Sequence, residues 1–227
     1  MSFFFKQLKR GVAKGFTLIE MLVVIAIFTI MTGIILANLP EFRDQTSLEL
    51  LAQQMAINIR TVQVYGVATR ISNDGQADRF GWYGIRFSLA DQGASVVNRS
   101  VSRMFSDVVQ DGKYDETTDV AEFDYRISNG YEITNICAVS SQNPNCVDMP
   151  GGMVDVVYRR PNPEATFCSG VNSTCAYNWD NFSEIYIKIG RISDGKRWKC
   201  LKVSSNGQIA VLPGFKLEKD APCYLAP

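Results

Sequence analysis

The run Phe16–Leu39, FTLIEMLVVIAIFTIMTGIILANL, decides how this chain is built, because its one charged residue is Glu20. A helix over this run would be roughly 36 Å long, and the hydrocarbon core of a bilayer is about 30 Å thick. The preceding residues 1–15 contain no acid and the basic residues Lys6, Lys9, Arg10 and Lys14. A basic flank stays on the cytoplasmic side, so the sequence predicts one membrane-spanning helix followed by an extracytoplasmic body.

Two other interpretations of this run are a secretory signal peptide and an uncut membrane anchor. A signal peptide has a shorter apolar run and a small-x-small cleavage site, which Ala37-Asn38-Leu39 matches poorly. A carboxylate in a bilayer costs about 2.5–3.5 kcal/mol, so Glu20 needs a partner. Cleavage between Gly15 and Phe16 would create an α-amine about one helical turn from Glu20. Amine and carboxylate would lower each other's burial penalty, and a pair between neighbouring subunits would also set their axial register.

The stretch Lys14-Gly15-Phe16-Thr17-Leu18-Ile19-Glu20 resembles the class III signal of type IV prepilins and type II secretion pseudopilins. The resemblance implies that prepilin peptidase removes the leader 1–15 after Gly15 and N-methylates Phe16. It implies that Glu20 acts in subunit assembly. It also implies the α+β pilin fold, in which a long N-terminal helix packs on an antiparallel β-sheet head. The partners implied are other pilin or pseudopilin subunits, prepilin peptidase, the membrane and an inner-membrane assembly platform.

The helix is expected to have a transmembrane half over residues 16–39 and an amphipathic half over residues 40–70. Pro40 removes a backbone hydrogen bond and Gly33 is a second weak point, so both are predicted kink positions. Apolar residues then recur at spacings of three and four, typical of a helix face packed on a sheet: Leu48, Leu51, Met55, Ile59 and Val62. The opposite, polar face is assigned Arg43, Gln45, Gln53, Asn58, Arg60 and Gln63. The helix is expected to end near Tyr65 or Ala68, with Gly66 as a terminator.

Residues 71–227 are expected to form a β-rich head, one antiparallel sheet laid over the amphipathic half of the helix. Alternating patterns predict strands at Trp82–Leu89, Val96–Phe105, Phe123–Ile127, Tyr131–Val139, Met153–Tyr158, Glu184–Ile189, Lys199–Ser204 and Gln208–Leu212. Hairpin turns are predicted at Ser128-Asn129-Gly130 and Ser205-Asn206-Gly207. The segments Leu51–Arg70, Gly81–Ser88 and Lys199–Val211 resemble the H-type pseudopilins and related minor pilins.

All six cysteines follow the membrane run, which favours disulfides in an oxidising compartment. They are Cys137, Cys146, Cys168, Cys175, Cys200 and Cys223. Pairing between sequence neighbours (137–146, 168–175 and 200–223) is the simplest pattern, and many other connectivities stay open. The interval from about 137 to 180 is interpreted as an inserted loop that disulfides hold because it buries little apolar surface.

Composition excludes several classes of function. The chain has no histidine, which excludes a histidine base and histidine metal ligands. No CxxC pair, P-loop, dinucleotide-binding or HExxH pattern occurs, so no enzymatic activity is expected. The net charge is zero, so no global attraction to nucleic acid is expected.

An acidic stretch in the head, DVVQDGKYDETTD, is a candidate Ca²⁺ site. Calcium prefers six to eight oxygen ligands, and the candidates are Asp107, Asp111, Asp115 and Asp119. The EF-hand pattern fails at Val109 and Thr118, and the alternative is a solvated turn around Asp111-Gly112. No other cofactor is expected.

Two basic groups raise the hypothesis of DNA binding, although DNA is not an expected partner. One is Arg159-Arg160-Pro161-Asn162-Pro163. The other comprises Lys196, Arg197, Lys199 and Lys202, with Trp198 placed among them as a candidate for stacking on bases. The alternative is a charged turn and a charged strand face.

The sequence therefore predicts a structural subunit, a minor pilin or pseudopilin of a type IV pilus or a type II secretion pseudopilus. It would cross the inner (cytoplasmic) membrane once, with an extracytoplasmic head, and join a periplasmic or extracellular filament. Two alternatives remain: a pilus-tip module that binds DNA or a surface ligand, and a membrane-tethered exported protein with no filament role. The pattern does not separate a pilus from a secretion pseudopilus.

Overall fold

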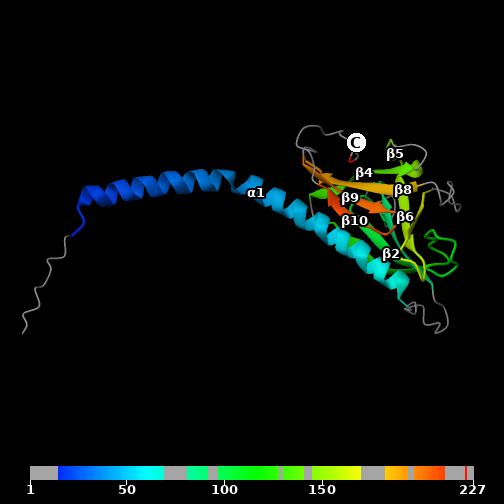
Figure 1. The fold of residues 1–227 in the computed structure, drawn as a ribbon. Helices are drawn as coiled ribbons and strands as arrows, with labels where there is room; N and C mark the ends of the chain where they lie inside the picture. The colour runs from blue at the N-terminus through cyan, green and yellow to red at the C-terminus, as the bar shows by residue number, and fades with distance from the viewer. Residues whose placement is uncertain are drawn as a thin grey trace, which may run out of the picture. The chain divides into compact units, whose positions relative to one another are not determined.

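The computed structural model describes residues 15–68, 81–91, 97–127, 130–140, 145–169, 182–193, 197–212 and 223. The chain divides into two compact units, Met1–Asp44 and Gln45–Pro227. One helix, α1 (Leu18–Val67), contributes its first part to the first unit and its second part to the second (Figure 1). The long helix and the β-rich remainder confirm the predicted α+β class.

The second unit holds two five-stranded antiparallel sheets, where the sequence predicted one. The first sheet has the order β3-β2-β1-β6-β7 and consists of β1 (Trp82–Ser88), β2 (Val101–Asp107), β3 (Val120–Arg126), β6 (Met153–Tyr158) and β7 (Ala165–Cys168). The second has the order β10-β9-β8-β4-β5 and consists of β4 (Tyr131–Ser140), β5 (Val147–Asp148), β8 (Phe182–Arg191), β9 (Trp198–Ser204) and β10 (Ile209–Leu212). A short 3-10 helix, η1 (Pro150–Gly152), leads into β6.

One hydrophobic core joins both sheets to the second part of α1. The predicted stripe is confirmed, because Leu48, Met55, Ile59 and Val62 are buried in this core and Leu51 packs against it. Burying each such side chain contributes about 1.5–3 kcal/mol. The sheets supply the remaining large buried side chains, among them Tyr83, Ile85, Phe87, Tyr158, Phe167, Ile133, Ile136, Ile185 and Ile187. The helix and both sheets therefore share one core in this unit.

The predicted polar face of α1 is wrong at two positions. Asn58 and Gln63 are buried rather than exposed. The Gln63 side-chain amide donates hydrogen bonds to the carbonyl oxygens of Pro163 at 2.8 Å and Gly207 at 3.1 Å. Gln63 therefore ties the helix to a loop and to a hairpin turn, a role that depends on residues about 100 and 144 positions away.

Gly66 does not terminate the helix, which ends one residue later at Val67. A Cβ placed on Gly66 would lie 2.6 Å from the Cβ of Tyr158 and 2.8 Å from its carbonyl oxygen. Glycine is therefore needed here because the helix backbone lies directly against β6.

The two predicted hairpins have different outcomes. The turn at Ser205-Asn206-Gly207 is confirmed, since β9 and β10 pair and Gly207 has a φ of 84°. The turn at 128–130 is not a hairpin, because β3 pairs with β2 in one sheet and β4 pairs with β8 and β5 in the other. A turn signal marks where a strand ends, but it does not say which strand the chain pairs with next.

Other differences lie at short or irregular elements. The strands β5 and β7 were not predicted, and both are too short for a clear alternating pattern. The predicted strand Val96–Phe105 begins later, at Val101, because residues 99–100 form a turn closed by a bridge between Asn98 and Val101.

The predicted insertion at about 137–180 is not a separate loop in its described part. This interval supplies β5 to one sheet and β6 and β7 to the other, and β6 buries Val154, Val156 and Tyr158 in the core. Two of the proposed disulfides, Cys137–Cys146 and Cys200–Cys223, are confirmed. Cys168 is disulfide-bonded, and its proposed partner Cys175 lies outside the described residues.

Candidate functional site

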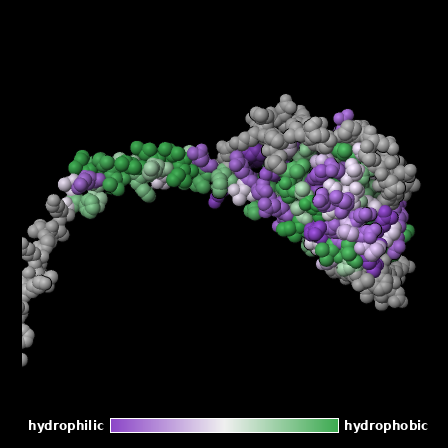
Figure 2. All heavy atoms as spheres, in the orientation of Figure 1, coloured by the Kyte–Doolittle hydropathy of each residue, from purple (hydrophilic) through white to green (hydrophobic). Residues whose placement is uncertain are grey.

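Among the described residues of its own unit, the first part of α1 is an apolar surface without cover. Large apolar side chains are exposed from Phe16 to Leu39, and the most hydrophobic window of α1 has a mean hydropathy of 2.6 with none of it buried. Figure 2 shows hydrophobic residues along this stretch. By length and composition the helix can cross a membrane. An exposed apolar surface of this extent marks a segment that contacts lipid or other apolar helices.

Polar side chains within this stretch satisfy their donors on the helix itself. The hydroxyls of Thr29 and Thr32 donate to the carbonyl oxygens of Ala26 at 2.9 Å and Phe28 at 2.7 Å. The Asn38 amide donates to the carbonyl oxygen of Ile34 at 3.0 Å. Such bonds need no water, so these residues fit the apolar surroundings that the rest of the helix requires.

Glu20, the predicted assembly residue, belongs to a capping box at the helix start. Its carboxylate accepts hydrogen bonds from the backbone N–H and the hydroxyl of Thr17, both at 2.9 Å. The Thr17 hydroxyl in turn accepts from the Glu20 N–H at 3.3 Å. This reciprocal arrangement satisfies backbone donors that would otherwise be orphaned at a helix N-terminus.

Thr17 is thus a site residue that sequence reasoning missed. The T-x-x-E spacing from Thr17 to Glu20 was the signal that would have found it. Glu20 was expected to need a charged partner, and the structure shows that Thr17 gives it an uncharged one within the chain. The cap leaves the carboxylate ionisable, so it remains available to an α-amine as well.

The predicted cleavage junction precedes this cap in non-helical backbone. Gly15, Phe16 and Thr17 lie outside the helix, and the Phe16 side chain is exposed. A Cβ added at Gly15 would meet no atom within 4 Å, and the same holds at Gly33. Packing among the described residues therefore does not require glycine at position 15. Gly33 and Pro40 both lie within α1, and the kink at these positions stays a prediction.

The four aspartates of the candidate Ca²⁺ site lie in and around the loop between β2 and β3, where they bind backbone amides. The buried Asp107 carboxylate accepts from the N–H groups of Gln110 at 2.6 Å and Gly112 at 2.6 Å. Asp119 accepts from the N–H groups of Val108 at 3.0 Å and Asp115 at 2.8 Å. These carboxylates therefore shape the loop from within.

The other two aspartates also have partners inside the chain. Asp115 accepts from the N–H and hydroxyl of Thr117, and Asp111 forms an ion pair with Lys113 at 3.3 Å. Across the part of the chain that the structure describes, no group of three or more Asp, Glu, Cys or His residues is arranged to hold a metal ion.

Burial has the largest effect on the pKa of two of these aspartates. It raises the pKa of Asp107 to about 7 and also raises the pKa of Asp119. By contrast, hydrogen bonds from Thr117 lower the pKa of Asp115. Burial makes the ionised form of these two carboxylates less stable. Their hydrogen bonds to backbone N–H groups are what link them to the loop.

The second basic group is largely engaged in contacts within the chain. Lys199 pairs with Glu49 on α1, and Lys202 pairs with Glu184 on β8. Trp198 is 4% exposed, so its ring is not available to stack on bases, contrary to the DNA hypothesis. Lys196 lies outside the described residues. In the first basic group, the Arg159 guanidinium stacks 5.0 Å from the centre of the Trp82 ring.

Residues 10–36 match a family model described as the prokaryotic N-terminal methylation motif. This is the class III signal of type IV pilins and pseudopilins, so the resemblance at residues 14–20 is confirmed. The match supports a pilin-like or pseudopilin protein that prepilin peptidase processes. No curated protein and no solved structure matches the chain.

Proposed function

We propose that this chain is a structural subunit, a minor pilin or pseudopilin, that assembles into a type IV pilus or type II secretion pseudopilus. Prepilin peptidase cuts after Gly15 and N-methylates Phe16. The processed helix then leaves the inner membrane with the help of an assembly platform and packs among the helices of other subunits. The head stays on the extracytoplasmic side throughout.

The observation that carries this proposal is the methylation motif placed on an apolar helix that has no cover in its own unit. In the membrane, lipid covers that surface, and in a filament the helices of neighbouring subunits replace the lipid. Glu20 supplies the one charge in the run, and the α-amine of a processed neighbour is a partner of opposite charge. Because the pair forms at one axial offset, it sets the register between subunits.

Two features of the second unit support the same role. The described disulfides indicate an oxidising compartment, in agreement with an extracytoplasmic head. Leu50, Ile57 and Val64 are exposed on α1 at spacings of seven, away from the buried stripe. Residues seven apart share one helix face, so this row supports packing against neighbouring subunits.

Intact-mass spectrometry of the protein isolated from its native membrane tests the processing step. We expect loss of residues 1–15 and one added methyl group on the wild-type chain. Gly15→Ala should retain the leader, whereas Gly33→Ala should be processed normally. The two variants form a matched pair, because an added Cβ meets no atom within 4 Å at either position.

The outcomes separate this proposal from a membrane-tethered exported protein without a filament role. An uncut wild-type chain, or equal processing of the two glycine variants, would contradict the proposal. Normal processing combined with absence of the chain from purified filaments would leave the peptidase step intact and overturn the structural role.

A further inference from the structure

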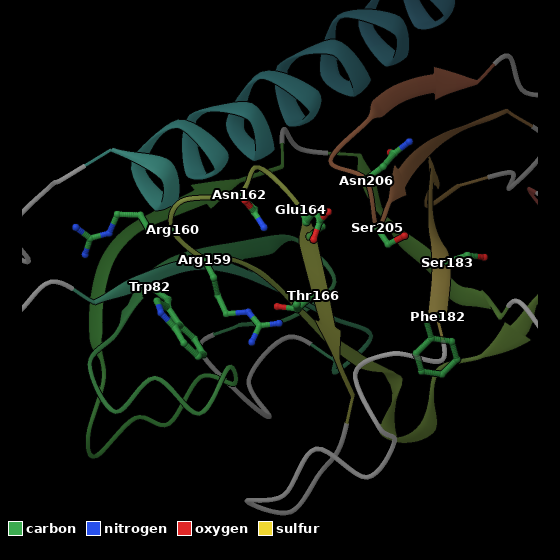
Figure 3. Close-up of a pocket in the computed structure, with 11 residues that line it drawn as sticks. Trp82, Arg159, Arg160, Asn162, Glu164, Thr166, Phe182, Ser183, Ser205 and Asn206 are labelled. Carbon is green, nitrogen blue, oxygen red and sulfur yellow. The ribbon is translucent and has the colours of Figure 1, made fainter.

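A polar pocket of about 670 Å³ opens on the head between β7 of the first sheet and the start of β8 with the β9–β10 turn of the second. Its wall includes the aromatic residues Trp82 and Phe182 and the charged residues Arg159, Arg160 and Glu164. Asparagine and hydroxyl side chains complete the lining: Asn162, Thr166, Ser183, Ser205 and Asn206. Figure 3 shows these side chains spread around the opening, with Trp82 and Phe182 on opposite sides of the view.

The two sheets are joined next to this pocket, which holds its walls in place. The Ala165 N–H on β7 donates to the carbonyl oxygen of Ser205 at 2.8 Å, and the Ser205 N–H donates to the carbonyl oxygen of Ser183 at 2.8 Å. The Thr166 hydroxyl donates to the carbonyl oxygen of Val157 at 2.9 Å. The lining is therefore built on paired strands, and binding at such a site loses less conformational entropy.

The Arg159 guanidinium is held by its contact with the Trp82 ring, which lies at 5.0 Å. A guanidinium fixed in this way presents a planar fork of donors that matches a carboxylate. Arg160 follows it directly and borders the same pocket, but Figure 3 shows its side chain extending away from Arg159. One end of the pocket thus favours an anionic group.

The rest of the lining favours a ligand rich in hydroxyl groups. Asn162, Asn206 and Glu164 offer planar groups that accept hydrogen bonds, and the two amides also donate them. The negative face of an aromatic ring attracts the weakly positive C–H face of a sugar ring, and two aromatic residues line the pocket. Two arginines beside one glutamate give a mixed charge. A polyphosphate backbone favours a wall of cations alone, so this lining fits one carboxylate among many hydroxyls better.

We propose that this pocket binds a short acidic oligosaccharide through its carboxylate at Arg159 and its sugar rings along the polar and aromatic wall. The proposal goes beyond the filament role and does not depend on it, because the pocket lies wholly in the second unit.

Titration calorimetry on the full chain in lipid nanodiscs tests the proposal, since nanodiscs avoid detergents that carry sugar headgroups. The probes are trigalacturonate and sialyllactose, each beside its neutral counterpart, galactotriose or lactose. We expect one or both acidic sugars to bind. The affinity should exceed that of the neutral counterpart by about tenfold or more, because one hydrogen bond to a charged group contributes a free energy of that size.

Arg159→Gln should weaken binding of that acidic sugar by about tenfold or more. The matched control is Arg126→Gln, at an exposed arginine on β3 that does not line the pocket, and it should bind normally. A circular dichroism spectrum shows that each variant is folded. The proposal is overturned if neither acidic sugar binds, if the neutral sugars bind equally well, or if both arginine variants lose affinity alike. Tighter binding of a hexathymidylate that Arg159→Gln abolishes would overturn it in favour of nucleic acid.

Discussion

At Gly66 a missing side chain sets how closely the helix approaches β6. The nearest atoms to an added Cβ are the Cβ and the backbone of Tyr158, and Tyr158 is fully buried. Neither partner can move aside as the end of a flexible side chain would. Close packing at this point therefore requires glycine, which has a hydrogen atom in the position where every other residue has a Cβ.

We expect Gly66→Ala to destabilise the head. Alanine is more favourable than glycine inside a helix by about 1 kcal/mol. Overpacking against β6 lowers the stability of the folded state by about 1–3 kcal/mol, and by more if the backbone shifts. Urea unfolding of the full chain in nanodiscs, followed by tryptophan fluorescence, measures the difference. Gly33→Ala is the control in the same helix, because its Cβ meets nothing within 4 Å. A Gly66→Ala chain as stable as the control would show that the close contact with Tyr158 is absent.

Asp107 is a residue whose charge is costly to the head. Burial raises its pKa to about 7 in the folded chain, whereas an unfolded aspartate titrates near about 4. Between these values the folded state binds the proton more tightly than the unfolded state. Its contribution to stability is therefore greatest at low pH, and falls as pH rises from about 4 to about 7.

Asp107→Asn should flatten the fall in the free energy of unfolding across that pH window, because the variant has no proton to lose. Urea unfolding at several pH values between about 4 and 8 measures the slope for both chains. Asp148→Asn is the control, since Asp148 is exposed on β5. An unchanged slope in Asp107→Asn would contradict a raised pKa at this position.

Among the elements, α1 carries two different functions along one continuous helix. Its first part exposes apolar side chains and begins at the Thr17–Glu20 capping box. Its second part buries a stripe in the core of the head and anchors it through Gln63 and Glu49. The carboxylate of Glu20 therefore has a local role at the helix start and a proposed role in assembly, and these can be separated.

Glu20→Gln should be processed normally but fail to enter filaments, because the amide cannot form an ion pair with the α-amine of a neighbour. Thr17→Ala removes the capping hydroxyl and leaves the Glu20 charge in place. It should cost about 1 kcal/mol of helix stability and still allow assembly. Intact mass measures processing, and immunoblots of sheared filaments measure incorporation. Equal loss of incorporation in both variants would mean that capping, rather than charge, is what assembly needs.

At the scale of the whole molecule, the two units differ in what stabilises them. The unit Gln45–Pro227 has its own core from two sheets and a helix, whereas the described part of Met1–Asp44 buries no large apolar side chain. Folding of the head therefore does not require the membrane run, although the run requires lipid or other helices.

A chain that begins at Gln45 should be soluble and unfold in one cooperative transition. It keeps the stripe Leu48–Val62, which covers the core side of the sheets. A chain that begins at Ala68 loses that stripe and should aggregate, because the apolar faces beneath it become exposed. Sedimentation and thermal unfolding compare the two. Insolubility of the longer chain, or solubility of the shorter one, would contradict this division.

The sequence by itself determined the N-terminal signal, the membrane run, the buried stripe of α1 and most strands, because each depends on residues close together in the chain. The local patterns are a glycine beside an apolar run, apolar residues that recur about every 3.6 positions in a helix, and apolar residues that recur every two positions in a strand. The tertiary structure alone decided that the strands form two sheets, that Gln63 is buried, that Gly66 faces Tyr158 and that the polar pocket exists. Each of these depends on residues far apart in sequence, and a local pattern does not state which distant backbone will lie against it.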